Sequence, residues 1–269
     1  MNEVSMDHLA VRRAFSKQSA GYDEADRTNP ILTRWRQRVY RHLDQFLKPG
    51  SIILELNAGT GIDALRLAMT GHQVLATDVA PGMVLQLQQK THEHSAAGRL
   101  TAQACSYETL EQLPDRKFDH VFSNFGGLNC CQDLGLVIRQ LPRLIHPGSR
   151  ITWVIMPHLC PWEWLWVFRG SWSAFRRLTS RGVKAHLEGE YFMTYYYSLA
   201  ELQQQFGPSY TLLKVEGLGA VSPPPASYDF VRRFPRLTKW LNTLDERISG
   251  VYPFSHWADH IIVTFEYKP

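Results

Sequence analysis

Short apolar runs that alternate with helical segments restrict the fold of this 269-residue chain more than any other feature. SIILEL (51–56), HQVLATD (72–78) and RITWVIM (150–156) each have the length and composition of a buried strand. Helical patterns separate such runs, at 62–71, 81–95 and 133–145. Strands that alternate with helices indicate a mostly parallel sheet with helices on both faces. We therefore predict an α/β fold.

Four further runs, LTAQAC (100–105), KFDHVFSNF (117–125), YTLLKVEGLG (210–219) and HIIVTFEY (260–267), complete a predicted sheet of seven strands. Helices are also expected over 5–26, from Pro30 to about Phe46, over 198–207 and over 227–248, and HPGS (146–149) is expected to be a turn. Segment 157–197 interrupts the alternation, because PWEWLWVF and YFMTYYY carry too many aromatic residues for a simple crossover. We predict that it forms a cap over a pocket, inserted after the fifth strand.

A glycine turn follows the first of these strands. In LELNAGTGIDALRLAMTGHQVLATD (54–78), Gly59 and Gly61 lie between a strand and a helix, and Asp78 ends the next strand. Such a turn presents unpaired backbone N–H groups, and the missing Cβ atoms allow a ligand to come close. An acid at the end of the second strand then lies where a ribose offers its hydroxyls. The pattern predicts an adenosine-containing ligand, although Asp78 could instead only cap the following helix.

Two classes of cofactor use this arrangement. The dinucleotide fingerprint requires a third glycine where helix and strand meet, and position 64 is an alanine. The form E-x-N-A-G-T-G instead resembles the first motif of the class I S-adenosylmethionine-dependent methyltransferases. FSKQSAGYDEAD (15–26), KFDHVFSNFGGLN (117–129) and LPRLIHPGSRITWVIM (141–156) are similar to segments of small-molecule methyltransferases related to the quinone and biotin-pathway enzymes.

That resemblance implies a Rossmann-like sheet that binds S-adenosylmethionine and releases S-adenosylhomocysteine. In it, Glu55, Gly59 and Gly61 would line the methionine part of the cofactor, and Asn57 and Ala58 would contribute backbone. The implied organisation is an N-terminal pair of helices over the cofactor (1–50), the cofactor-binding core (51–156), the cap on the acceptor side (157–197) and the completion of the sheet (198–269).

Further roles follow from the same resemblance. Asp78 would bind the ribose hydroxyls, and Val79 and Met83 would pack against the adenine. Tyr22 and Arg34 would cover the cofactor, with Arg34 pairing its carboxylate, although either residue could serve packing or solvation alone. After the fourth strand, the residues expected near the reacting methyl group are Asn124 and Phe125.

The sequence departs from the family pattern at two places. Asn57 stands where the family usually has glycine, which would alter how closely the turn wraps the methionine group. The acid that usually receives the adenine amino group is absent, and Cys105, Ser106 and Tyr107 occupy that segment. We expect the backbone there, with Ser106 or Tyr107, to substitute for it.

The acceptor side is less specified by sequence. His158, directly after the fifth strand, is the best-placed general base, with Tyr195 as a second candidate, although His158 could be only a loop histidine. Trp162, Glu163 and Trp166 are acceptor-side candidates in the cap, where Trp162 and Trp166 share one helix face. The tryptophans could equally form the core of the cap itself.

Composition excludes several other classes. No apolar run is long enough to cross a bilayer or to act as a secretory signal, so we expect a cytoplasmic protein. The four cysteines have no metal-ligand or disulfide-framework spacing, and no metal is expected. Two arginine clusters (34–41 and 232–236) could meet an acidic partner, but a net charge of +4 does not favour nucleic acid.

We therefore predict a methyltransferase acting on O, N or C of a small aromatic, polyketide-like or lipid-like metabolite, as a monomer or homodimer. A catalytically inactive module that binds the cofactor or a nucleotide, and an NAD-dependent oxidoreductase, are the alternatives.

Overall fold

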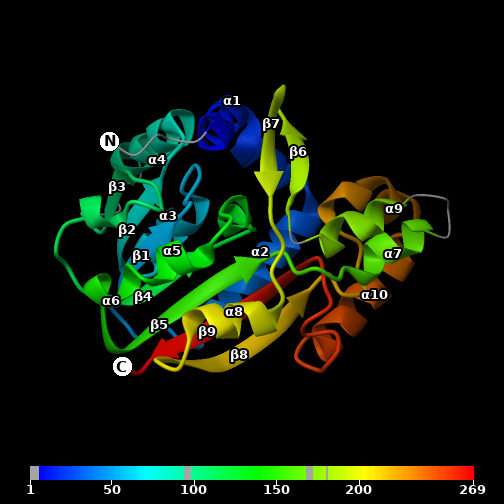
Figure 1. Cartoon of the computed structure of the whole chain (residues 1–269). Helices are drawn as coiled ribbons and strands as arrows, with labels where there is room; N and C mark the ends of the chain where they lie inside the picture. The colour runs from blue at the N-terminus through cyan, green and yellow to red at the C-terminus, as the bar shows by residue number, and fades with distance from the viewer. Residues whose placement is uncertain (1–5, 94–97, 168–171, 180) are drawn as a thin grey trace.

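The computed structural model describes residues 6–93, 98–167, 172–179 and 181–269. Seven strands form one sheet in the order β3-β2-β1-β4-β5-β9-β8 (Figure 1). Their bounds are β1 Ile52–Leu56, β2 Gln73–Asp78, β3 Leu100–Ala104, β4 Phe118–Ser123, β5 Ile145–Ile155, β8 Tyr210–Leu218 and β9 His260–Tyr267. Neighbouring strands pair in parallel from β3 to β5, and β9 is antiparallel to both β5 and β8. The predicted seven-stranded, mostly parallel α/β sheet is confirmed.

Helices cover both faces of the sheet because the strands are apolar on both faces. On one face pack α2 (Pro30–Leu43), α3 (Ile62–Met69) and α4 (Pro81–Glu93), against alternate residues of the central strands such as Ile53 and Phe122. On the other face pack α5 (Leu134–Ile138), α6 (Leu141–Leu144) and α8 (Leu199–Phe206), against Leu54 and Trp153. Two separate apolar clusters result, one on each face.

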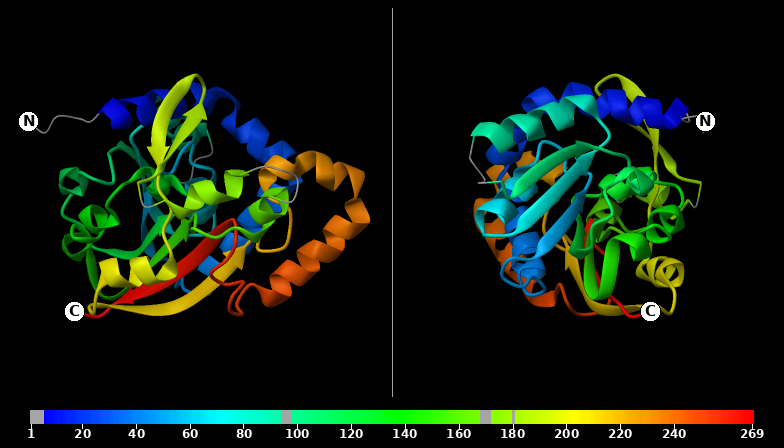
Figure 2. Two further views of the ribbon diagram at one scale, coloured as in Figure 1. Left: turned by 45° about the vertical axis from the view of Figure 1, so that its right-hand side comes forward. Right: turned by 90° about the vertical axis from the view of Figure 1, so that its left-hand side faces the viewer.

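Helix α1 (Met6–Thr28) lies across the edge at which the parallel strands end, as both views in Figure 2 show. Beside it stands a hairpin of β6 (Val183–Leu187) and β7 (Glu190–Thr194) (Figure 1). Arg13 and Lys17 of α1 pair with Glu190, and the Met193 N–H donates to Asp7. The hairpin and α1 thus form one cover over the sheet edge.

The insertion after β5 is present where it was predicted, and consists of α7 (Pro161–Val167), a 3₁₀ helix (Trp172–Leu178) and the β6–β7 hairpin. The chain then continues through α8, β8, a 3₁₀ turn (Pro225–Ser227), α9 (Tyr228–Arg233) and α10 (Pro235–Ile248) into β9. Two more 3₁₀ turns, Leu110–Gln112 and Gly127–Cys130, flank β4. Within the part of the chain that the structure describes, every helix is too short or too polar to cross a membrane.

Three predicted elements differ in detail. The helices expected over 133–145 and 227–248 are each split, because Pro142 lies in the first turn of α6 and Pro235 begins α10, and a proline does not continue an existing helix. The HPGS segment is a bulge within β5 rather than a separate turn: the pairing with β4 moves from Phe118–Ile145 to His120–Arg150.

Candidate active site

The glycine turn between β1 and α3 lines part of the cavity described below. Asn57 and Gly59 both have positive φ angles, 53° and 57°, which asparagine and glycine tolerate better than other residues. The Asn57 side chain donates to Ser123 Oγ over 2.9 Å, and a Cβ atom on Gly127 would lie 2.7 Å from it. Asn57, which stands where the family usually has glycine, therefore fixes the turn to the end of β4 and the loop after it.

Gly61 packs closely against helix α4. Its φ angle is 85°, and a Cβ atom there would lie 2.2 Å from Leu87 Cδ1 of α4. Gly61 is therefore required for close packing between the turn and α4. It does not line the cavity described below.

Asp78, at the end of β2, is tied to the same turn. Its Oδ2 accepts the Gly59 N–H over 2.9 Å and its Oδ1 accepts the Ala80 N–H over 2.8 Å. Burial raises the pKa of Asp78, and the backbone hydrogen bonds only partly offset that rise. Val79 contributes a third backbone hydrogen bond. A carboxylate has about four lone-pair sites, so Asp78 can still accept a hydrogen bond from a ligand.

A buried charge network lies behind the turn. Arg36 of α2 donates to Asp63 over 2.5 Å and to both oxygens of Asp26, while Tyr40 and Asn124 also donate to Asp63. Burial would raise the pKa of Asp63, but Arg36 outweighs it and holds that pKa below its ordinary value. The network fixes Asn124 at the carboxyl end of β4.

Glu55 is the acid that precedes the turn, and its environment is unusual. Its side chain is only 1% exposed, and no hydrogen-bond partner for its Oε2 occurs among the described residues. Burial, with Asp63 and Asp78 nearby, raises the pKa of Glu55 well above its ordinary value, although Arg36 opposes the shift. A buried carboxyl oxygen without a partner is uncommon, and it marks Glu55 as an unusual residue behind the turn.

One cavity opens along the ends of β1, β2 and β4. Of the residues predicted to bind the cofactor, it is lined by Tyr22, Asn57, Gly59, Asp78, Val79, Met83, Cys105, Tyr107, Asn124 and Phe125. Four other predicted residues do not line this cavity, although residues close to them in the sequence do. They are Glu55, Ala58, Gly61 and Ser106. The cavity thus has a polar end, formed by the Asp78 carboxylate, and an apolar wall, formed by Val79 and Met83.

Helix α1 closes this cavity. Val11, Phe15 and Tyr22 of α1 contribute to its lining. Asp23 receives a hydrogen bond from Thr60 in the glycine turn over 2.5 Å and pairs with Lys90 over 2.5 Å. These contacts hold α1 directly over the turn.

A second cavity adjoins the first. It is lined by Gln18, Tyr22, Ala25, Asp26, Leu32, Trp35, Phe125, Pro225 and His260. Because Tyr22 and Phe125 line both cavities, their rings form the boundary between them. Phe125 has a φ angle of 44°, uncommon for a bulky residue, and the Arg36 guanidinium lies 4.8 Å from its ring centroid. Backbone strain of this kind is concentrated at functional sites.

Arg34 does not reach either cavity, which corrects the prediction that it covers the cofactor. Its guanidinium pairs with Glu246 of α10 over 2.6 Å, in a surface depression shared with Arg41 and Arg66. Two residues further along α2, Arg36 points to the opposite side and enters the buried network described above.

The two predicted catalytic residues also lie outside the cavities. The His158 ring is held at both nitrogens, by the Arg177 carbonyl over 2.5 Å and by Glu201 over 3.0 Å. The Tyr195 ring packs against Gly182 and the core of the α8 face, and burial raises its pKa. Neither residue lines either cavity.

The acceptor-side candidates in the cap belong to its internal structure. Trp162 donates to Ser227 over 3.0 Å and packs edge-on against Phe230. Glu163 accepts hydrogen bonds from Arg177 over 2.7 Å and from Arg176 over 3.1 Å. The side chain of Trp166 lies outside the described residues.

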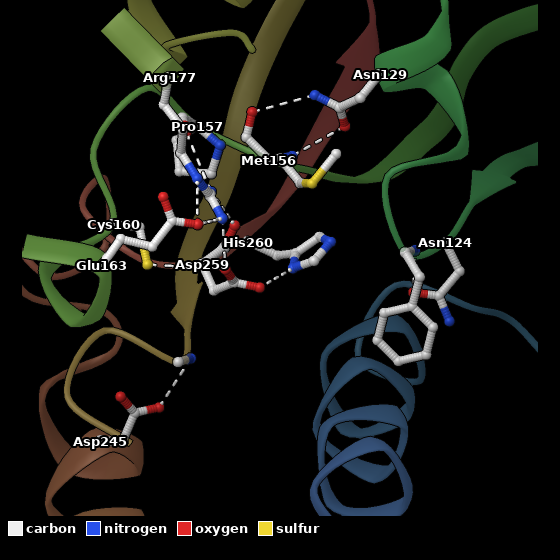
Figure 3. A network of polar contacts seen from close by, with 12 residues as sticks. Asn124, Asn129, Met156, Pro157, Cys160, Glu163, Arg177, Asp245, Asp259 and His260 are labelled. Carbon is white, nitrogen blue, oxygen red and sulfur yellow. Dashed lines mark hydrogen bonds and ion pairs between the residues drawn. The ribbon is translucent and has the colours of Figure 1, made fainter. Parts of the chain in front are cut away.

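Cys160, Glu163 and Asp259 bring possible metal-ligand atoms within 4.8 Å of one another. The Arg177 guanidinium is hydrogen bonded to both carboxylates of this cluster, as Figure 3 shows. A cation therefore already neutralises the cluster, and the arrangement is an ion-pair network.

Comparison with known proteins agrees with this geometry. Residues 53–148 match a family model described as a methyltransferase domain. This part of the chain, which holds the glycine turn and Asp78, is thus similar to a methyltransferase domain. A demethylmenaquinone methyltransferase of Corynebacterium efficiens is 30% identical over 135 residues, which cover 48% of this chain and 54% of that protein. A malonyl-[acyl-carrier protein] O-methyltransferase of Yersinia pestis is 29% identical over 149 residues, covering 55% and 51%.

The methyltransferase fold extends beyond the matched residues. The crystal structure of Burkholderia thailandensis 1,6-didemethyltoxoflavin-N1-methyltransferase superposes with a TM-score of 0.58 at 14% identity, over 100% of this chain and 93% of that one. At this identity the likeness shows the fold alone. The chain spans a little over half the length of the curated relatives it matches. The predicted Rossmann-like methyltransferase fold is confirmed.

Sequence reasoning missed the part of the site that is assembled from distant segments. Trp35 and His260 belong to α2 and β9, and neither lies in a recognisable motif. A signal for His260 did exist, because an antiparallel strand begins at the edge where its parallel neighbours end. The first residue of such a strand therefore lies beside the site.

Proposed function

We propose that this protein transfers a methyl group from S-adenosylmethionine to a small molecule. The observation that supports this most directly is the cavity along β1, β2 and β4, in which Gly59 and Asp78 stand beside an apolar wall. The positions match the family's glycine turn and ribose-binding acid. The family match to residues 53–148 includes both.

The residues of the first cavity fit the cofactor in three respects. The unsatisfied Glu55 carboxyl lies behind the turn, where the methionine part would be held. The Asp78 carboxylate can accept a hydrogen bond from the ribose, and Val79 and Met83 offer an apolar surface to the adenine. When bound, the cofactor supplies a methyl group that is already activated by a sulfonium charge.

The chain's own contribution is positioning and the exclusion of water. Phe15 and Tyr22 of α1 close the first cavity, and the bonds of Asp23 to Thr60 and Lys90 hold that helix in place. Holding two reactants in line contributes roughly 7 to 11 kcal/mol to such a transfer. The shared boundary at Tyr22 and Phe125 is where the two reactants would meet.

The acceptor would occupy the second cavity, whose walls are mainly aromatic and aliphatic. This composition supports an aromatic, polyketide-like or lipid-like acceptor. The relatives named above are described as acting on demethylmenaquinone and on malonyl-[acyl-carrier protein], which supports a metabolite rather than a nucleic acid.

Calorimetric titration with S-adenosylmethionine, S-adenosylhomocysteine and NAD tests the cofactor. Micromolar binding of the first two, with none of NAD, is the expected result. Binding of NAD alone would favour an oxidoreductase and refute the proposal. Binding of S-adenosylmethionine without methyl transfer to any acceptor in a broad screen would favour an inactive module.

A cytoplasmic location and a monomeric or homodimeric state are further parts of the proposal. The four cysteines are all buried and unpaired, which suits a reducing compartment. Cell fractionation and light scattering on the purified protein test the two statements separately.

A further inference from the structure

A histidine lies at the wall of the second cavity, beside the boundary with the first. His260 is the first residue of β9, and its Nδ1 lies 3.0 Å from Asp259 Oδ2. In Figure 3 the imidazole extends from the Asp259 side toward the side on which Asn124 lies. A Cβ atom on Gly126, which lines the first cavity, would lie 3.3 Å from His260 Nε2. The free edge of the imidazole thus lies close to the junction of the two cavities.

Asp259 fixes the imidazole in one orientation. Arg177 donates to Asp259 Oδ1 over 2.6 Å and to its backbone carbonyl over 3.0 Å, and Figure 3 shows these contacts. Burial would raise the pKa of Asp259, but the Arg177 charge and the His260 hydrogen bond outweigh burial and hold that pKa far below its ordinary value. An ionised Asp259 requires a proton on Nδ1, which leaves Nε2 as the proton acceptor.

No hydrogen-bond partner of Nε2 is found in the ranges that the structure describes. The ring is nevertheless held sterically. Trp35 lies edge-on to it with ring centroids 5.7 Å apart, and Phe125 lies at 6.1 Å. This combination of a fixed ring and an available nitrogen is the arrangement of a general base.

The remaining walls indicate the kind of acceptor. The second cavity has apolar walls that suit a planar molecule, formed by Trp35, Phe125, Tyr22 and Leu32. Gln18 also lines the cavity, and its Oε1 is buried without a hydrogen-bond partner among the described residues. A second polar group on the acceptor would satisfy it. Asp26 is already paired in both oxygens with Arg36, so the cavity presents no free carboxylate to attract a cation.

We propose that the second cavity binds a phenol or enol, and that His260 is the catalytic base that removes the proton from its hydroxyl. This inference rests on the proposed function. The hydroxyl proton passes to His260 Nε2 while the acceptor oxygen forms a bond to the methyl carbon. The bond from that carbon to the sulfonium sulfur breaks, and its electron pair neutralises the sulfur. Asp259 stabilises the imidazolium until solvent takes the proton.

Several other charged or titratable groups surround this histidine. Tyr22 is the nearest alternative acid or base, but burial raises its pKa, so it stays protonated at neutral pH. The groups that face His260 or its partner from the packed elements are Asp259, Arg177, Glu163, Cys160, Tyr22, Asp26 and Arg36. Within the described part of the chain, His260 differs from these groups because it lies on the cavity wall and has a ring nitrogen, Nε2, without a hydrogen-bond partner.

The test uses 4-nitrophenol as a probe, because its ionised form absorbs visible light. The full chain is first saturated with S-adenosylhomocysteine, and calorimetry confirms binding in the first cavity. The probe is then added at a pH below its own pKa. Wild-type protein is expected to bind the probe as the phenolate.

His260→Gln keeps a polar side chain without a basic nitrogen, and His260→Ala provides a second variant. Both are expected to lower the ratio of bound phenolate to phenol by at least about tenfold, which corresponds to one pKa unit. Unchanged affinity for S-adenosylhomocysteine shows that each variant is folded. His146→Gln is the matched control, because that exposed histidine pairs with Asp119 at the opposite end of β5 and should leave the spectrum unchanged.

The outcomes separate the two proposals. Failure of the wild type to bind S-adenosylhomocysteine refutes the proposed function. Normal binding of that ligand with no binding of 4-nitrophenol, or with binding only as the neutral phenol, overturns the present inference alone. An undiminished phenolate signal in a folded His260 variant overturns the assignment of the base.

Discussion

Replacement of Asp78 by alanine tests how the first cavity holds its ligand. In the proposed complex the Asp78 carboxylate accepts hydrogen bonds from ribose hydroxyls in addition to those from Gly59 and Ala80. A hydrogen bond to a charged group contributes roughly 1.5 to 3 kcal/mol. Since every 1.4 kcal/mol or so is a tenfold change in affinity, Asp78→Ala should weaken binding of S-adenosylmethionine by about 10- to 100-fold.

The same substitution removes the partners of two backbone N–H groups, so a loss of stability must be separated from a loss of contact. Calorimetric titration at low temperature, with the folded fraction measured by circular dichroism, makes that separation. Asp133→Ala is the matched control, because Asp133 accepts the Gly135 N–H over 2.9 Å at the start of α5 and lies outside the cavity. Unchanged affinity in folded Asp78→Ala protein would refute the ribose assignment.

The affinity should also depend on pH in a defined direction. Burial raises the pKa of Asp78, and the ionised carboxylate is the better acceptor for hydroxyl groups. As the pH falls, wild-type affinity should therefore begin to decline above the pH at which an ordinary aspartate protonates. Asp78→Ala should lack this component of the pH dependence, and a wild-type affinity that stays constant down to pH 4 or so would contradict the argument.

Three further predictions concern stability, each measured by urea denaturation. Gly61→Ala should cost about 1 to 3 kcal/mol, because the new methyl group meets Leu87 at a positive φ angle. Glu55→Gln should stabilise the ligand-free protein relative to the wild type as the pH rises above about 4.5. The pKa of Glu55 is higher in the folded than in the unfolded protein. Its contribution to the free energy of unfolding is therefore present below the unfolded-state pKa and is lost as the pH rises. Arg177→Met should cost roughly 3 to 5 kcal/mol, because it leaves the buried Asp259 carboxylate without its arginine and Glu163 with Arg176 alone.

The sequence was sufficient to predict the sheet because its strands are short, apolar and separated by helices. It brought Gly59, Asp78 and Asn124 to one edge of the sheet for a related reason: each lies at or just after the end of a recognisable strand, and all three line the first cavity. Arg34 and Arg36 show the limit of such reasoning. Both lie in one run of arginines on α2, and only the packing of that helix determines which of them enters the buried network.

The cap shows a second limit. Aromatic content predicted an insertion, but it could not distinguish rings that face a ligand from rings that pack against one another. Trp162 packs against α9 and the 3₁₀ turn before it, so this side chain stabilises the fold. His158 was favoured because it follows β5 directly, yet both of its nitrogens are engaged by contacts that no local pattern reveals.

The two halves of the site differ in how their residues are brought together. The first cavity, proposed for the cofactor, is built from turns that follow β1, β2 and β4, so its geometry depends on local backbone conformation and on strand pairing. The acceptor half joins α1, α2, a turn before α9 and the start of β9, which meet only in the folded protein. Substitutions in Gln18 or Leu32 can therefore alter the shape of the second cavity without touching Gly59 or Asp78. A methyltransferase core organised in this way can keep its cofactor site while its acceptor changes.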